Sequence, residues 1–363
     1  MNYYPLVKNL LFSFGQNTSW THHCLIYLAQ KYPYFAGQFF PKKGHVDFFN
    51  LKESAKYHLL VGDNIWTFPV GLGSGLDVNG NLLQFLSQFY FGALEIGPIN
   101  PCLEQKNSCT HRFFERMGDN QSLKSLEIFN TQNIEKIKEN IERYRKSLPI
   151  GINLTYKDLP SKKELSINGL IHSYEIMKDC ADYFVINPMP YEQLKEFLQS
   201  ITFQKPTFLK ICPDLVHKEI IDLLHLVVDH SLCGVIATGA TGVHPFGQGE
   251  ITGTYLRDRA QSVQSFIFDI LKNDKSIEVI GSGGISRFVD IWNFWKMGGR
   301  VVQLFSSFIY QGPNLLIKIK KEIDEILSYY HLQSVEQILQ SIDSLHYPIP
   351  RKKVRRELLH QRL

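Results

Sequence analysis

A short apolar run, followed by turn residues and then by a helical pattern, recurs along most of this chain. Each run is rich in β-branched or aromatic residues, which favour an extended backbone, and is short enough to be a single strand. Eight strands are expected, at 66–74, 92–99, 149–155, 183–188, 207–213, 234–240, 277–285 and 301–307. Eight strand–helix units in one chain predict a (β/α)8 barrel, the TIM-barrel fold.

Helical patterns lie between most of these runs, and the clearest are at 133–148 and 315–330. The longer connections follow the second, third and sixth strands, around 100–132, 156–170 and 240–253. In a barrel of this kind, these connections lie at the carboxyl ends of the strands, where barrel enzymes place their chemistry.

The two ends of the chain differ from the repeating part. Residues 3–14 and 20–35 are amphipathic and rich in aromatic residues, which predicts a helical hairpin with one apolar face. Such a hairpin is either a cap packed on the core or a patch lying in a bilayer interface, at the mouth of an apolar tunnel. The basic segment 351–363 is either a solvated helical tail or a contact for an anionic membrane surface or a partner protein. The expected units are a helical hairpin at 1–50, the barrel at 51–330 and a helical basic tail at 331–363.

Composition excludes several classes of function. A net charge of +4 on 363 residues is too small to predict a nucleic-acid partner. The six cysteines form no C-x-x-C pair and show no zinc spacing, so we expect reduced thiols and no metal site. The chain shows no signal peptide at its start and no run of 18 apolar residues, so we expect a cytoplasmic protein without a membrane-spanning helix.

Glycines gather where the seventh predicted strand ends, in the segment IGSGGI at 280–285. The eighth predicted strand and its exit, VQLFSS, follow at 302–307. Barrels often bind phosphate between the loops that follow these two strands, because glycine lets backbone N–H groups approach an anion. Glycine also makes tight turns, so it is the place of this cluster in the strand order that predicts a phosphate site.

Lys210 stands inside the apolar run TFLKICP, where a buried charge is costly without a partner. Two interpretations remain open: an ion pair with a neighbouring strand, or a cation that faces a ligand gaining negative charge. Asn153 and Asn187 end two other strands, and buried amides also need partners. Together these side chains are suited to read the edge of a flat heterocycle.

An ordered series of motifs resembles one family. The series is GLGSGLDVNG (71–80), EIGPINP (95–101), ERMGDN (115–120), GINL (151–154), LKICPDL (209–215), GVIAT (234–238), IGSGGI (280–285) and VQLFSSFIYQGP (302–313). Over about residues 1–325 the chain resembles the FMN barrel of dihydroorotate dehydrogenase, and its first residues resemble the class 2, membrane-associated, quinone-reducing form. The resemblance implies FMN, a small-molecule substrate, a quinone acceptor and peripheral contact with the inner face of a membrane.

The resemblance implies a largely intact flavin half of the site. The turn against the flavin is matched by Gly73, Ser74 and Gly75, and the contacts to the ring are matched by Asn153, Asn187 and Lys210. Further flavin contacts are matched by Thr238 and Gly253. The residues that bind the phosphate are matched by Gly283, Gly284, Phe305 and Ser306. The family's lysine stabilises negative charge on the reduced flavin, and Phe305 stands where the class usually has tyrosine. Near the quinone path the matching residues are Arg112 and either His22 or His23.

The substrate half departs from the family. After the fourth strand the class 2 pattern is N-x-S-S-P-N, whose second serine is the catalytic base, and here Pro190 falls on that serine and Glu192 on the substrate-binding asparagine. Glu115 replaces another substrate-binding asparagine, Gly239 replaces an amide of the loop after the sixth strand, and Val78 replaces a lysine that holds the substrate carboxylate.

These departures share a direction, because dihydroorotate is an anion and the site loses a cation while it gains Glu115, with Glu192 and Asp119 as further candidates. Like charges in a poorly solvated pocket cost on the order of several kcal/mol. Glu115 is the candidate base, since desolvation raises a carboxylate's pKa towards neutrality. The leading prediction is an FMN-dependent oxidoreductase resembling quinone-dependent dihydroorotate dehydrogenase, an enzyme of pyrimidine biosynthesis. The alternatives are an FMN oxidoreductase with a different, non-anionic substrate and a non-catalytic flavoprotein.

Overall fold

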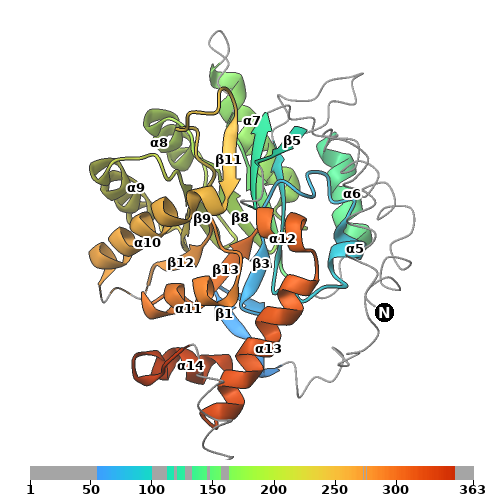
Figure 1. The fold of residues 1–363 in the computed structure, drawn as a ribbon. Coiled ribbons are helices and arrows are strands. Elements are labelled where there is room, and N and C mark those ends of the chain that lie inside the picture. The colour runs from blue at the N-terminus through green and yellow to red at the C-terminus, as the bar shows by residue number, and fades with distance from the viewer. Residues whose placement is uncertain are drawn as a thin grey trace, which may run out of the picture.

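A closed barrel of eight parallel strands organises the chain (Figure 1). The computed structural model describes residues 55–347 except 100–112, 118–120, 127–132, 145–147, 157–162, 273 and 275. The barrel strands are β3 (Val70–Leu72), β4 (Leu94–Ile99), β7 (Ile150–Leu154), β8 (Tyr183–Ile186), β9 (Thr207–Ile211), β10 (Gly234–Ala237), β12 (Glu278–Gly281) and β13 (Val301–Leu304). Each strand pairs with the next, and β13 pairs with β3 to close the ring. Each predicted run contains one strand, so the predicted (β/α)8 barrel is confirmed.

Helices cover the outside of the barrel, which is why its strands are apolar on both faces. The helices that follow the strands are α6 (Ile134–Tyr144), α7 (Lys163–Met177), α8 (Tyr191–Gln199), α9 (His217–Asp229), α10 (Arg257–Leu271), α11 (Phe288–Lys296) and α13 (Asn314–Tyr329). In α9, for example, Ile220, Leu224 and Val227 are buried at a spacing of four and three residues, which is the apolar stripe of a surface helix. The helices predicted at 133–148 and 315–330 correspond to α6 and α13.

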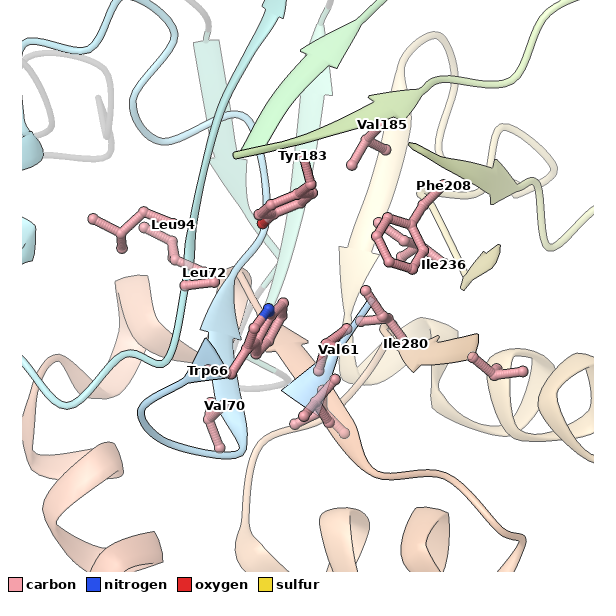
Figure 2. Packing of buried hydrophobic residues seen from close by; sticks show 14 of the residues in the cluster. Val61, Trp66, Val70, Leu72, Leu94, Tyr183, Val185, Phe208, Ile236 and Ile280 are labelled. Carbon is pink, nitrogen blue, oxygen red and sulfur yellow. The ribbon is translucent and has the colours of Figure 1, made fainter. Parts of the chain in front are cut away.

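A β-hairpin fills the amino-terminal end of the barrel. It consists of β1 (Leu59–Val61) and β2 (Asn64–Trp66), which pair antiparallel. Its Trp66 is only 1% exposed, and its ring centroid lies 6.4 Å from that of Tyr183 on β8. Figure 2 shows Val61 and Trp66 packed beneath the apolar residues of the barrel interior. This end is therefore closed by side chains.

Three further strands form a small antiparallel sheet at the opposite end of the barrel (Figure 1). They are β5 (Phe113–Arg116), β6 (Ser122–Leu126) and β11 (Glu250–Gly253), in the order β11–β6–β5. The sequence predicts loops at 100–132 and 240–253, and this part of the prediction is wrong. The strands are short, and β11 pairs with a strand far away in the chain, so no local pattern marks them.

Short helices complete the described part of the chain. They are η1 (Ala55–Tyr57), α5 (Leu83–Leu86), η3 (Thr254–Leu256), α12 (Ser306–Gln311), α14 (Val335–Ser341) and η4 (Ile342–Ser344). Val335 and Ile338 of α14 are buried in the main core cluster. The predicted hairpin at 1–50 and the basic segment 351–363 lie outside the described residues, and the unit boundaries stay predictions. Within the described ranges, no helix is both long enough and apolar enough to cross a bilayer.

Candidate active site

A buried polar network crosses the barrel interior at the carboxyl ends of the strands. Its centre is Glu95 of β4, which is 1% exposed. Glu95 Oε1 lies 2.9 Å from Lys210 Nζ of β9 and accepts a 2.7 Å hydrogen bond from Asn153 Nδ2 of β7. Glu95 Oε2 accepts a 2.7 Å hydrogen bond from Gln303 Nε2 of β13. Four strands that are not all neighbours are thus joined through one carboxylate.

The network decides the charge state of Glu95. Burial alone would raise the pKa of this carboxyl, but the charge of Lys210 and the hydrogen bonds from Lys210, Asn153 and Gln303 outweigh burial and hold the pKa below its usual value. Glu95 and Lys210 therefore form an ion pair near neutral pH, and the pair as a whole is neutral.

Lys210 also faces a pocket. Its Nζ donates a 3.3 Å hydrogen bond to Ser74 Oγ, and both residues line a cavity of about 400 Å³ above the network. The size and the mixed lining are those of a site for a cofactor or small molecule. The lining comes from the carboxyl ends of barrel strands and the segments that follow them, and from β11 and η3.

At one side of this pocket lies a turn suited to an anion. Gly283 and Gly284 have φ of 99° and 72°, and a Cβ on Gly284 would lie 2.5 Å from the Arg257 backbone. Arg257 Nε donates to the Gly284 carbonyl at 3.2 Å and so fixes the turn. Within the described residues, the backbone N–H groups of Gly283 and Gly284 donate no hydrogen bond. Free N–H groups in such a turn are the usual partners of a phosphate.

Most of the predicted flavin-contacting residues meet in this pocket. The lining contains Gly73, Ser74, Asn187, Lys210, Thr238, Gly253, Gly283, Gly284, Phe305 and Ser306. Asn153 lies beneath the lining and donates to Asn187 Oδ1 at 3.0 Å, and Gly75 donates its backbone N–H to the Gly97 carbonyl. Lys210 has an ionic partner and also lines the pocket, and its role towards a ligand that gains negative charge stays a prediction. The partner is on a strand across the barrel rather than on a neighbouring strand.

The loop after β8 brings no acid–base group to the pocket. Pro188, Met189 and Pro190 all line it, and Pro190 is the residue before the first turn of α8. Glu192 and Tyr191, the next two residues in α8, are exposed and are not among the described lining residues.

The structure does not bring Glu115 into the pocket. Glu115 lies on β5 with 73% of its side chain exposed, and its nearest charge is Lys124 Nζ at 3.9 Å. Asp119, Arg112, His22 and His23 lie outside the described residues.

Sequence reasoning missed several residues of this site. Glu95 and Gln303 carry a signal that could have identified them, since each is a polar residue inside an apolar strand, as Lys210 is. Cys212 and Glu250 also line the pocket, but they carry no such signal. Burial raises the pKa of the Cys212 thiol to about 11, and the nearby carboxylates of Asp214 and Glu250 act in the same direction, so this thiol is neutral near pH 7.

No group of three or more histidine, cysteine, aspartate or glutamate side chains with the geometry of a metal site occurs in the described part of the chain. The polar groups of the described lining are amides, hydroxyls, the Cys212 thiol, the Lys210 ammonium, the Glu250 carboxylate and free backbone donors.

Comparison with known proteins agrees with the barrel and with the family that the sequence resembles. A family model described as Dihydroorotate dehydrogenase matches residues 61–327. The proteins named dihydroorotate dehydrogenase (quinone) from Christiangramia forsetii and Thermosynechococcus vestitus are 29% and 31% identical, with 71% and 70% of this chain and 81% and 77% of theirs covered. The crystal structure of DHODH from Eimeria tenella in complex with ferulenol has the same fold, with a TM-score of 0.73, 20% identity, and coverage of 92% of this chain and 98% of that chain.

The family model covers well over half of the chain, and the relative from Thermosynechococcus vestitus is similar over most of both sequences. Residues from most of the motifs that resemble the family line the pocket. This chain belongs to the dihydroorotate dehydrogenase family.

Proposed function

We propose that this protein is an FMN-dependent oxidoreductase of the dihydroorotate dehydrogenase type. The observation that carries the proposal is the shape of the pocket, which has a cross-barrel polar network at its base and a glycine turn with free N–H groups at its side. A flat heterocycle with a phosphate on a flexible chain needs these two features together.

The residues present fit FMN. Gly283 and Gly284 would hold the phosphate with their backbone N–H groups, and Ser306 lies beside them in the lining. Asn187 and Lys210 would hold the polar edge of the ring. Buried Ser307 Oγ and Asn153 Oδ1 have no hydrogen-bond partner among the described residues, as expected of groups that await one.

FMN, when bound, supplies a ring that accepts a hydride from a substrate. Lys210 would place a positive charge beside a ring that gains negative charge, and Glu95 holds that lysine in position from below. The closed amino-terminal end of the barrel confines the ligands to the carboxyl end, away from bulk water on one side.

We further propose that the acceptor is a quinone and that the segment 1–50 brings the protein to the inner face of a membrane. The support is that the curated relatives are named for a quinone acceptor and that residues 3–14 and 20–35 are amphipathic.

The sequence motifs predict that the substrate half of the site departs from the family. A second candidate function, oxidation of a substrate other than dihydroorotate, is favoured by the loop after β8, where two prolines and a methionine line the pocket. None of these side chains removes a proton, so oxidation of a C–H bond by the family's route would lack its base.

The test uses the purified full-length protein. We expect a yellow protein with about one FMN per chain, whose flavin is bleached slowly or not at all by dihydroorotate under anaerobic conditions, and is bleached by a chemical reductant. A colourless protein that takes up no FMN would contradict the proposed cofactor. Rapid turnover with dihydroorotate and a quinone would instead show that dihydroorotate is the substrate.

A further inference from the structure

One acidic side chain in the pocket is not used by the proposed function. Glu250 is the first residue of β11. Two residues later in the same strand, Thr252 Oγ1 forms a 2.7 Å hydrogen bond with Ser306 Oγ, and both of these residues line the pocket. Side chains two residues apart in a strand point to the same face, so Glu250 faces the pocket as Thr252 does. It lies about 7 Å further along the strand, at the outer part of the lining.

The carboxylate of Glu250 is free. It forms no hydrogen bond or ion pair with any described residue, and it is only partly buried. The other carboxylates beside the pocket are engaged: Glu95 by Lys210, and Asp214 by Arg259 Nη1 at 2.5 Å. Glu250 alone of these three is available to a ligand.

The charge of the pocket follows from these contacts. Among the described lining residues, the charged side chains are Lys210 and Glu250. Glu95 neutralises Lys210, so the carboxylate of Glu250 leaves the pocket with one uncompensated negative charge. Met189 and Pro190 of the same lining carry no charge, and Cys212, which is near Glu250, has a thiol that is protonated near pH 7.

A ligand with a carboxylate at this end would meet a like charge that no cation of the described lining offsets, which disfavours binding. A ligand with an ammonium or N–H donor group would instead meet an unpaired acceptor, which favours binding.

We propose that Glu250 determines substrate specificity, so that the pocket takes a flat heterocycle with a cationic or N–H donor substituent directed at the Glu250 carboxylate. The proposal rests on the proposed flavin oxidoreductase and names the substrate class of that same site.

The test compares three probes built on one ring. They are orotate, which is anionic, 6-methyluracil, which is neutral, and 6-(aminomethyl)uracil, which is cationic. Their dissociation constants are measured at pH 7.5 by calorimetry on the FMN-loaded full-length protein and on Glu250→Gln. We expect the cationic probe to bind the unaltered protein at least about tenfold more tightly than orotate, and Glu250→Gln to lower that ratio about tenfold with little effect on 6-methyluracil.

Glu196→Gln is the matched control, because Glu196 is an exposed glutamate of α8 outside the described lining. Glu196→Gln should leave the ratio of the two affinities, cationic probe over orotate, unchanged.

In the unaltered protein, a higher salt concentration should lower this ratio, because salt screens the charge of Glu250. This measurement needs no variant.

Tighter binding of orotate, equal affinities, failure of the cationic probe to bind, or an unchanged ratio in Glu250→Gln would each overturn the proposal. A shift with Glu115→Gln but not with Glu250→Gln would overturn it too, in favour of the carboxylate singled out from the sequence. The flavin spectrum is recorded on the same samples. A yellow protein that binds orotate more tightly than the cationic probe would therefore contradict only the role of Glu250. A protein that binds no flavin would contradict the proposed function.

Discussion

At the scale of single residues, Lys210 illustrates how a buried charge is tolerated beside a ligand site. The sequence shows that it needs a partner, since it lies within an apolar strand. The partner, Glu95, lies on a strand three places away around the barrel, so the pair spans the interior. The network therefore serves both the packing of the core and the pocket above it.

Removing one charge of the Lys210–Glu95 pair should destabilise the folded protein more than removing both charges. We expect Lys210→Met to lower the free energy of unfolding by about 3–5 kcal/mol, because it leaves Glu95 buried without a counter-charge. The double variant Lys210→Met with Glu95→Gln should recover at least about half of that loss. Urea unfolding at pH 7.5 measures both, and strictly additive effects would show that the two residues are not coupled.

The same pair predicts a pH dependence. The pKa of Glu95 in the folded protein lies below its ordinary value of 4.5, so its ionised form stabilises the fold above that value. This stabilisation is lost as the pH falls through the lowered folded pKa. The difference in the free energy of unfolding between the unaltered protein and Lys210→Met should accordingly become smaller as the pH is lowered. As a control, Lys136→Met, which removes the exposed pair with Glu139, should change the free energy of unfolding little at any pH.

At the scale of elements, the loop between β10 and β11 is held by one carboxylate. Asp214, which follows β9, accepts hydrogen bonds from Thr241 Oγ1 at 2.6 Å and from the backbone N–H of Gly242 at 2.8 Å, and it pairs with Arg259. Burial opposes its ionisation, but the Thr241 hydroxyl, the Gly242 N–H and Arg259 hold its pKa below the usual range. This loop leads into β11, so Asp214 positions Glu250 indirectly.

Asp214→Asn should therefore loosen the loop without unfolding the barrel. We expect the amide hydrogens of Gly242 and Val243 to exchange about tenfold faster or more, since a charged acceptor becomes a neutral one. Hydrogen exchange followed by NMR or mass spectrometry measures the change. Asp269→Asn, at an exposed position of α10, should leave these amides unaffected, and equal protection in Asp214→Asn would refute the role of the carboxylate.

At the scale of the whole molecule, the barrel has one closed end and one open end. The hairpin β1–β2 fills the amino-terminal end with Trp66, and the sheet β11–β6–β5 stands at the other end beside the pocket. We therefore expect a second reactant to enter from the carboxyl end, where the described pocket lies.

Membrane contact is a prediction for the ends of the chain. Deleting residues 1–35 should abolish co-sedimentation with vesicles that contain anionic lipid, because the amphipathic segments there supply the apolar face. Deleting 351–363 should weaken binding only modestly, since basic residues alone give a salt-sensitive contact. Vesicle binding that persists without residues 1–35, in a protein whose circular dichroism shows it is folded, would show that the hairpin is not the anchor.

The sequence by itself determined the barrel and part of the pocket lining. Apolar runs set the strands, and the residues that end parallel strands must meet at one edge. Lys210, Asn187 and the Gly283–Gly284 turn were found in this way. The other flavin-contacting residues predicted in the lining were expected from the family resemblance.

Only the tertiary structure decided which side chains meet across the barrel. The partnership of Glu95 with Lys210 and Gln303 depends on closure of the ring, and the place of Glu250 depends on the pairing of β11 with β6. It also placed Glu115 on an exposed strand rather than in the pocket. Contacts between residues far apart in the chain are set by strand register and closure, which a linear pattern does not contain.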